Sequence, residues 1–171
     1  MKVFWLAAVA VLIPGANAEA GFLDEAFAAT KEGRVSCYAR QYDDAHLKSH
    51  PRQKTTFFSV AMLAENADGR GNSAEDFQLQ VGVEAKGGKE RYYGHAYCKA
   101  DGETANCFLE GDGGRMTLKP ADGGRIRVEA GNYGLAFEGS DFLQIGAEES
   151  DDNVFLIDKS TDGLCAEKNP E

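Results

Sequence analysis

Apolar and polar residues alternate along short stretches of this chain, and this alternation limits the fold more than any other feature. The clearest stretch covers residues 77–85, where every second residue is apolar. A period of two places these side chains on one face of a β-strand. The segment 86–89 contains paired glycines that suit a tight hairpin turn, so residues 91–98 are predicted to return antiparallel.

Similar stretches recur along the chain at a spacing of about 8–12 residues, separated by Gly, Asp and Asn. Segments long enough to form the helical crossovers of a parallel sheet are absent from the sequence. The pattern therefore predicts an all-β fold, an antiparallel sandwich or barrel of about eight to ten short strands. The further predicted strands are 35–42, 55–64, 104–110, 115–119, 125–130, 134–137, 142–147 and 153–158.

Helical patterns occur at two places only. Residues 22–30 are predicted to form a short N-terminal helix that Gly33 is placed to end. Residues 44–49 form a second helix, with Asp43 as its N-cap and Pro51 just past its end. The polar, glycine-rich segment 66–76 is predicted to be a loop.

The first 18 residues have the pattern of a secretory signal peptide. Lys2 precedes an apolar run, Pro14 interrupts it, and Ala16-Asn17-Ala18 offers the small residues that signal peptidase recognises. The run is shorter than the roughly 20 apolar residues of a membrane helix. We therefore expect export, a signal peptide over 1–18, a single β-rich domain over 19–171 and no membrane span.

Acidic residues outnumber basic ones, 28 against 18, and the formal net charge is −10. This balance argues against nucleic acid and anionic membrane surfaces as partners, because both repel an acidic protein. It permits a cationic partner without requiring one, since acidic surfaces are common on soluble proteins.

Four cysteines follow the predicted signal: Cys37, Cys98, Cys107 and Cys165. An even number in an exported chain predicts disulfides, with three possible connectivities. Cys98 and Cys107 flank a polar segment centred on an Asp-Gly pair, so we predict that they are bonded across a hairpin. We also predict Cys37–Cys165, which would join the start of the β domain to its last turn. A zinc site is the alternative, but C-x-x-C spacing is absent.

The predicted strand 91–98 carries the first candidate site. If Cys98 points toward Cys107, its face turns inward and Tyr93, His95 and Tyr97 face outward or into a second layer. Aromatic side chains with a polar edge are common at binding surfaces, although they are also good strand formers. We predict a ligand or partner surface at these three residues.

The second candidate is a basic strip on an otherwise acidic chain. His46 and His50 are spaced i, i+4, which on a helix suits two metal ligands. The cationic neighbours disfavour a dication and suit an anion or an acidic partner, and H-E-x-x-H is absent. We therefore predict either a plain surface or a contact with an anion or a partner, and no metal or cofactor. The residues are His46, Lys48, His50, Arg52 and Lys54.

Signatures of catalysis and of common β-domains are missing. The sequence lacks a G-x-S-x-G elbow, and the predicted disulfides leave no free thiol as a nucleophile. An EF-hand alignment from Asn66 fails, because Phe77 takes the place of the terminal glutamate. Trp5, the only tryptophan, lies in the predicted signal, so the domain lacks the buried tryptophan of immunoglobulin domains.

Two segments are similar to parts of a known group of proteins. Residues 36–47 (SCYARQYDDAHL) with His50-Pro51 resemble the opening of small exported proteobacterial proteins of unknown function, and residues 152–158 (DNVFLID) with Cys165 resemble their ends. The resemblance implies a bacterial periplasm and supports pairing of the outer cysteines. It implies no activity, substrate or catalytic residue.

We therefore expect a non-enzymatic periplasmic binding or interaction module, whose partner is a protein or a small molecule. An acidic inhibitor or chaperone-like partner of a cationic protein is the first alternative. A hydrolase or metal-dependent enzyme is the second.

Overall fold

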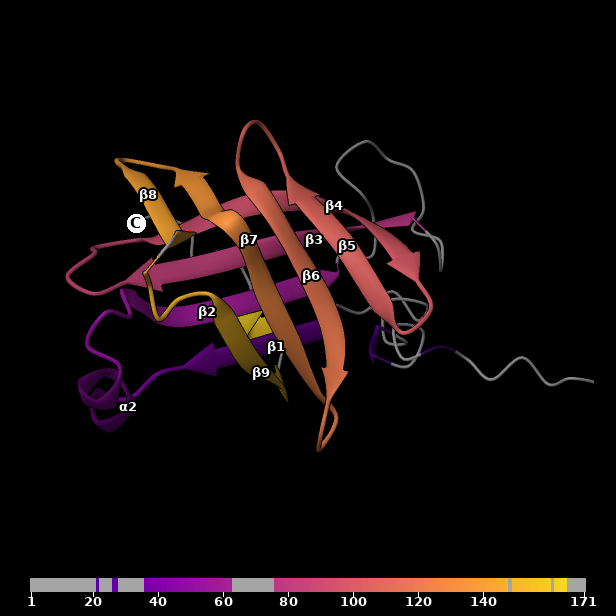
Figure 1. Ribbon diagram of the computed structural model, residues 1–171, viewed down its shortest axis with the longest axis horizontal. Coiled ribbons are helices and arrows are strands. Elements are labelled where there is room, and N and C mark those ends of the chain that lie inside the picture. The colour runs from indigo at the N-terminus through magenta and orange to yellow at the C-terminus, as the bar shows by residue number, and fades with distance from the viewer. Residues whose placement is uncertain are drawn as a thin grey trace, which may run out of the picture.

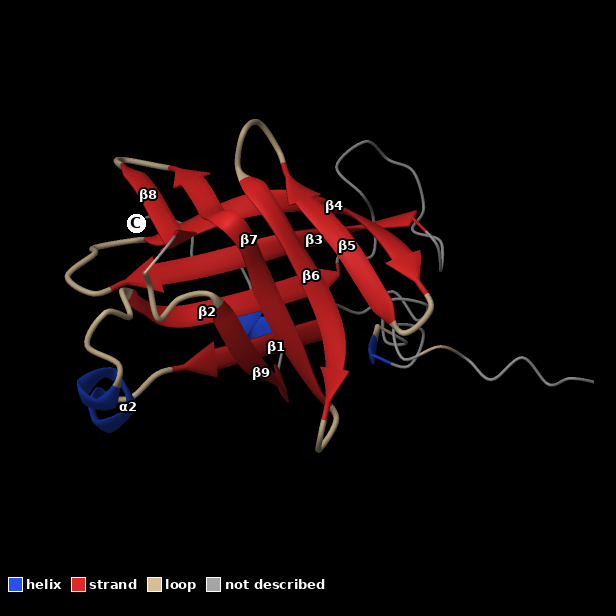
Figure 2. Ribbon diagram, in the orientation of Figure 1, coloured by secondary structure: helices blue, strands red, loops and turns tan. Residues whose placement is uncertain are grey.

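The computed structural model describes residues 21, 26–27, 36–62, 76–147, 149–160 and 162–165. Strands make up most of these residues, and the helices are short (Figure 2). Among them no helix is both long enough and apolar enough to cross a membrane. The elements are β1 (Ser36–Gln41), α2 (Asp44–Ser49), β2 (Thr55–Met62), β3 (Asp76–Ala85), β4 (Arg91–Asp101), β5 (Thr104–Leu109), β6 (Gly114–Ala121), β7 (Arg125–Glu138), β8 (Phe142–Ala147), β9 (Val154–Ser160) and α3 (Asp162–Cys165).

Eight of the nine strands close into an antiparallel barrel. The strand order is β6-β5-β4-β3-β2-β1-β9-β7-β8, and an additional pairing of β6 with β7 closes the ring. In Figure 1, β5, β6 and β7 lie in front and cross over β1, β2 and β3 behind them. The extra strand, β8, pairs with β7. The structure confirms the all-β prediction and selects the barrel over the sandwich.

Strand β7 is longer than the sequence predicts. The sequence suggests separate strands over 125–130 and 134–137, because a Gly-Asn pair and Gly134 lie between conventional strand residues. That prediction is wrong, since one strand runs through all of them. Gly134 has φ +73°, and the β6–β7 register shifts between Gly114 and Met116. The irregularity is therefore absorbed within the strand as a bulge.

Side chains fill the interior of the barrel. Phe58 of β2 and Phe155 of β9 stack with their ring centroids 4.0 Å apart, and their exposed fractions are 0% and 1%. Burying a large apolar side chain this completely contributes about 1.5–3 kcal/mol to folding. The interior is a packed core, as expected for a barrel of eight strands.

Both predicted disulfides are present. Cys98 and Cys107 lie directly opposite each other in the β4–β5 register and are bonded. Cys37 is bonded to Cys165 of α3, 128 residues along the chain. Cys165 also joins a second, small apolar cluster with Cys37, Ala39, Phe57 and Ala61, on the face of β1 and β2 away from the barrel core. Two disulfides are compatible with an oxidising compartment.

The helix predicted over 44–49 is confirmed as α2. The Asp43 carboxylate accepts a hydrogen bond of 2.7 Å from the backbone N–H of His46, which caps the helix. The N-terminal helix over 22–30 and the loop over 66–76 fall largely outside the described residues. Of the former, Ala26 and Phe27 are described, and both side chains are buried in the barrel core.

We predict that Gly134→Ala destabilises the protein far more than Gly87→Ala. Both glycines have positive φ, +73° and +77°, so alanine introduces about 1–2 kcal/mol of backbone strain at either position. A Cβ at Gly134 would also lie 2.7 Å from the amide nitrogen of Ala147, whereas nothing lies within 4 Å at Gly87. Urea denaturation should show a loss of at least about 3 kcal/mol for Gly134→Ala and about 1 kcal/mol for Gly87→Ala. Equal losses would contradict the close approach of β7 and β8.

Candidate functional site

The three side chains of the first candidate site lie on the outer face of β4. Tyr92, Ala96 and Cys98 belong to the barrel core, so the predicted inward face is confirmed. Tyr93, His95 and Tyr97 alternate with them and are half-buried, and the His95 side chain is 35% exposed.

Only two of these three side chains line the same cleft. Tyr93 and His95 line one cleft. Tyr97 lies further along β4, where its ring stacks on that of Phe108 at a centroid distance of 5.8 Å. The structure therefore brings two of the three predicted residues together in a concave site.

Glu110, in the turn after β5, connects Tyr97 to His95. The Tyr97 hydroxyl donates a hydrogen bond of 2.8 Å to Oε1 of Glu110, and Nδ1 of His95 lies 3.7 Å from Oε2. The backbone N–H of Glu110 donates to the carbonyl of His95 at 2.9 Å, which holds the turn against β4. With 48% of its side chain exposed, the Glu110 carboxylate is still open to solvent.

The cleft has a volume of about 440 Å³ and lies between β4, the β5–β6 turn and the β7–β8 hairpin. Ligand sites are typically clefts of about 300–1,000 Å³, so its size suits a small molecule or an inserted side chain. Leu109 and Phe137 contribute apolar surface, whereas Glu110, Asp112 and Glu138 contribute carboxylates.

The cleft exists because β5 pairs with only the second part of β4, from Ala96 onward. Pairing of β5 with β4 stops where Leu109 lies opposite Ala96, and the chain then turns away toward β6. The turn packs closely, because a Cβ at Gly113 would lie 2.6 Å from Cβ of Leu109. On the edge away from β3, the residues of β4 before Ala96 therefore have the β7–β8 hairpin beside them without strand pairing.

Glu90 fixes the tip of that hairpin. Its carboxylate accepts hydrogen bonds from the hydroxyl and the backbone N–H of Ser140, at 2.6 and 2.8 Å. These bonds hold the pKa of Glu90 below its ordinary value. These bonds tie the hairpin to the residue that precedes β4 and so hold the two walls of the cleft in position.

Three exposed aromatic side chains lie in or next to the cleft, and they are the most exposed large apolar side chains in the described part of the chain. Tyr133 is 88% exposed and Phe142 68% exposed, and both line the cleft. Phe108 is 55% exposed and lines an adjoining depression of about 810 Å³ that shares Tyr133 with the cleft. Large apolar side chains gathered at the surface mark interaction sites.

Sequence reasoning missed all three aromatics. Phe108 could have been found, because Cys107 and its alternate neighbours point inward and Phe108 must then point outward. Tyr133 lies beside the irregular Gly134, and Phe142 opens a hairpin strand, so simple alternation did not indicate their exposure.

The basic strip lies on α2 and the segment after it. The rings of His46 and His50 stack at a centroid distance of 4.2 Å, and Tyr42 lies 4.7 Å from His46 on the other side. Arg52 forms an ion pair of 2.8 Å with Asp151. The structure thus shows a stacked ring cluster beside an arginine that already has an acidic partner, and the anion or partner contact at these five residues stays a prediction.

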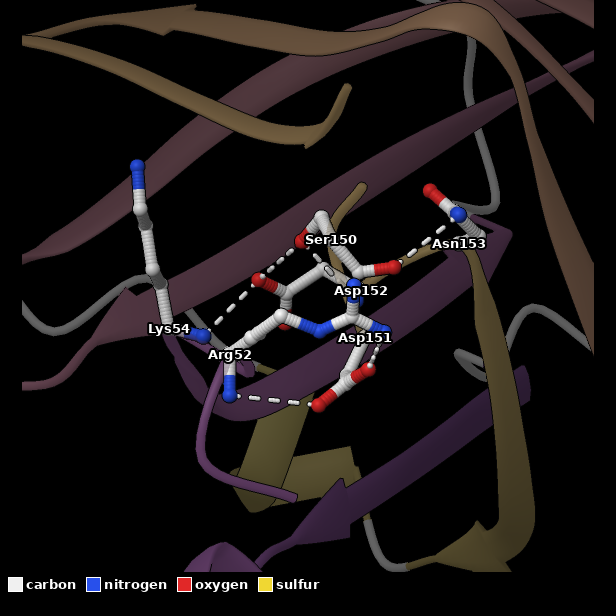
Figure 3. Close-up of polar contacts among 6 residues, drawn as sticks. All are labelled: Arg52, Lys54, Ser150, Asp151, Asp152 and Asn153. Carbon is white, nitrogen blue, oxygen red and sulfur yellow. Dashed lines mark hydrogen bonds and ion pairs between the residues drawn. The ribbon is translucent and has the colours of Figure 1, made fainter. Parts of the chain in front are cut away.

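Asp152 anchors the connection between β8 and β9 to the segment before β2 (Figure 3). Its side chain is fully buried, and its carboxylate accepts hydrogen bonds from the backbone N–H groups of Lys54 and Thr55, at 2.8 and 3.0 Å. The hydroxyl of Ser150 donates a third, at 3.1 Å. This buried carboxylate therefore has a structural role.

Asp151 lies next to this anchor and points toward Arg52 (Figure 3). Desolvation raises the pKa of Asp151, but hydrogen bonds from the side chain and backbone of Arg52 outweigh it and bring the pKa below its ordinary value. As pH falls, the Asp151 carboxylate is therefore protonated, and its ion pair with Arg52 lost, at a lower pH than for an ordinary aspartate.

Metal ligation and similarity to known proteins add no further assignment. Across the described ranges, no three or more His, Cys, Asp and Glu side chains are grouped so that they could hold a metal ion. No protein-family model, curated protein or solved structure matches the chain. The site is therefore interpreted from its own geometry.

We predict that Asp152→Ala lowers the free energy of unfolding by about 3 kcal/mol, because two backbone N–H groups lose a charged acceptor at a buried position. Asp151→Ala is the matched control, because its ion pair with Arg52 is at the surface, where such pairs add little. Thermal and urea unfolding of both variants would test this. A similar loss for the two variants would show that Asp152 is not the anchor.

Proposed function

We propose that this chain is an exported, non-enzymatic binding or interaction module that binds its partner in the cleft between β4, the β5–β6 turn and the β7–β8 hairpin. The observation that carries the proposal is the coincidence of this cleft with the exposed Tyr133, Phe142 and Phe108. Aromatic side chains are enriched at protein interfaces and account for much of the binding energy there.

The chemistry of the cleft favours binding over nucleophilic catalysis. His95 lies near Glu110, an arrangement that could orient an imidazole as a base. However, the described residues that line the cleft include no serine, threonine or cysteine for such a base to activate. The interior of the barrel is packed, so the cleft is the better place for a ligand.

Export to the periplasm is supported by two independent features. The N-terminal segment has the charge, apolar run and small residues of a signal peptide. The two disulfides are compatible with an oxidising compartment. The resemblance to small exported proteobacterial proteins agrees with this location.

Fragment binding tests the cleft. In a protein-observed NMR screen with small apolar and aromatic fragments, hits should shift the amide signals of residues 93–95, 110–113 and 133–138. Tyr133→Ser and Phe142→Ser should each weaken the best hit about tenfold, the equivalent of 1.4 kcal/mol. Val154→Ser, an exposed apolar position on β9, is the control and should leave binding unchanged. Shifts centred elsewhere, or scattered over the surface, would refute the proposed site.

Intact-mass measurement tests export. Protein recovered from the periplasmic fraction of a bacterial host should begin at Glu19, because the signal is expected to be removed after Ala18. Its mass should also show four cysteines without free thiols. Recovery from the cytosol with residues 1–18 still attached would contradict export.

A further inference from the structure

We infer that the cleft receives the guanidinium group of an arginine side chain from a partner protein. This inference rests on the proposed function, since it uses the same cleft, and it adds the chemistry of the group that is bound.

The charge of the cleft is the first argument. Glu110, Asp112 and Glu138 line it, and among its described lining residues none is lysine or arginine, although Arg115 lines the adjoining depression. The whole chain has a formal net charge of −10, which is of the same sign. Concave sites lined by one sign of charge concentrate ligands of the opposite sign.

The second argument is the placement of a carboxylate beside an exposed ring. Glu138 of β7 and Phe142 of β8 are directly opposite each other in the strand register, and both are exposed. Directly opposed residues share a face with their Cβ atoms about 5 Å apart. A planar cation at this pair can donate hydrogen bonds to the carboxylate and stack on the ring, which a guanidinium does better than an ammonium.

The same combination occurs inside the protein at Arg91. Arg91 places its guanidinium carbon 3.7 Å from the ring centroid of Phe57, and it donates hydrogen bonds of 2.9 and 2.7 Å to one carboxylate oxygen of Glu84. Its side chain is only 4% exposed. The Glu138–Phe142 pair offers the same ring and carboxylate at the surface, and within the described part of the chain no lysine or arginine forms an ion pair with Glu138.

The openness of the surface favours a polypeptide over a free small molecule. Small ligands typically have about 70–90% of their surface buried in their site. Here the cleft continues into the depression beside Phe108, and its rim aromatics reach 88% exposure. An arginine inserted in the cleft, with flanking residues covering Tyr133 and Phe108, would bury this rim in the way that interface aromatics are buried.

Titration of the full chain with a matched peptide pair tests the inference. The first probe is the capped peptide Gly-Leu-Arg-Leu-Gly, and the second has citrulline, which is nearly isosteric with arginine but uncharged, in place of arginine. By NMR, the arginine peptide should shift the amide signals of the cleft and bind at least about tenfold more tightly than the citrulline peptide. Its affinity should fall as sodium chloride rises from about 20 to about 300 mM, because salt screens exposed charges.

Two variants locate the charge that matters. Glu138→Gln should weaken the arginine peptide at least about threefold and leave the citrulline peptide unchanged, because it removes one charge and preserves shape. Glu103→Gln removes an exposed charge in the β4–β5 turn, outside the cleft, and should change neither affinity. Equal weakening by the two variants would mean diffuse attraction to an acidic surface, which would overturn the inference.

The remaining outcomes separate the inference from the proposed function. Equal binding of both peptides in the cleft, or binding of apolar fragments alone, would refute the recognition of a guanidinium group. The proposed function as a binding module would still hold. Absence of cleft shifts with peptides and fragments alike would overturn both. Agmatine, a free guanidinium compound, serves as a third probe, and binding as tight as that of the arginine peptide would overturn the assignment of a protein partner.

Discussion

Along its first half, β7 forms backbone hydrogen bonds with β6 on one edge and with β9 on the other, and this double pairing turns a nine-stranded sheet into a closed barrel. Closure determines the rest of the architecture. It forces every second side chain of the eight barrel strands into a common interior, where Phe58 meets Phe155. Along this seam it also pairs the backbone polar groups of β7 with those of β6 and β9, which avoids the energetic penalty of unsatisfied backbone groups.

The cleft marks the place where that closure is incomplete. Because β5 ends at Leu109, the beginning of β4 lacks a paired strand on that edge and has the β7–β8 hairpin beside it. The hydrogen bonds between Glu90 and Ser140 and between Glu110 and Tyr97 hold the two sides of the gap in fixed positions. A site built in this way loses little conformational entropy when it binds, since its walls are ordered in advance.

Local patterns in the sequence were sufficient to predict elements whose geometry depends on near neighbours. The alternation of apolar and polar residues predicted the inward face of β4, and a hairpin signal predicted the Cys98–Cys107 disulfide. The N-cap residue Asp43 predicted the start of α2. The continuity of β7 could not be found in this way, because the need for glycine at position 134 comes from the close approach of β8, which no local pattern shows. The cleft depends on the relative ends of β4 and β5, which no local pattern specifies, so Tyr93 and His95 were found without the aromatic side chains around them.

The pairing of β1 with β9 affects the order in which the barrel assembles. These strands pair, and Cys37 bonds to Cys165, although they lie at opposite ends of the described chain. A nascent polypeptide emerges from its N-terminus, so the seam between β1 and β9 is the last to have both its sides available. Until then one edge of β1 has no strand beside it, and Phe58 lacks the ring that covers it. Such long-range joins slow folding, because distant segments must meet before any contact offsets the entropy of bringing them together. Until the last residues of the chain complete this seam, the protein is therefore most exposed to wrong pairing with other chains.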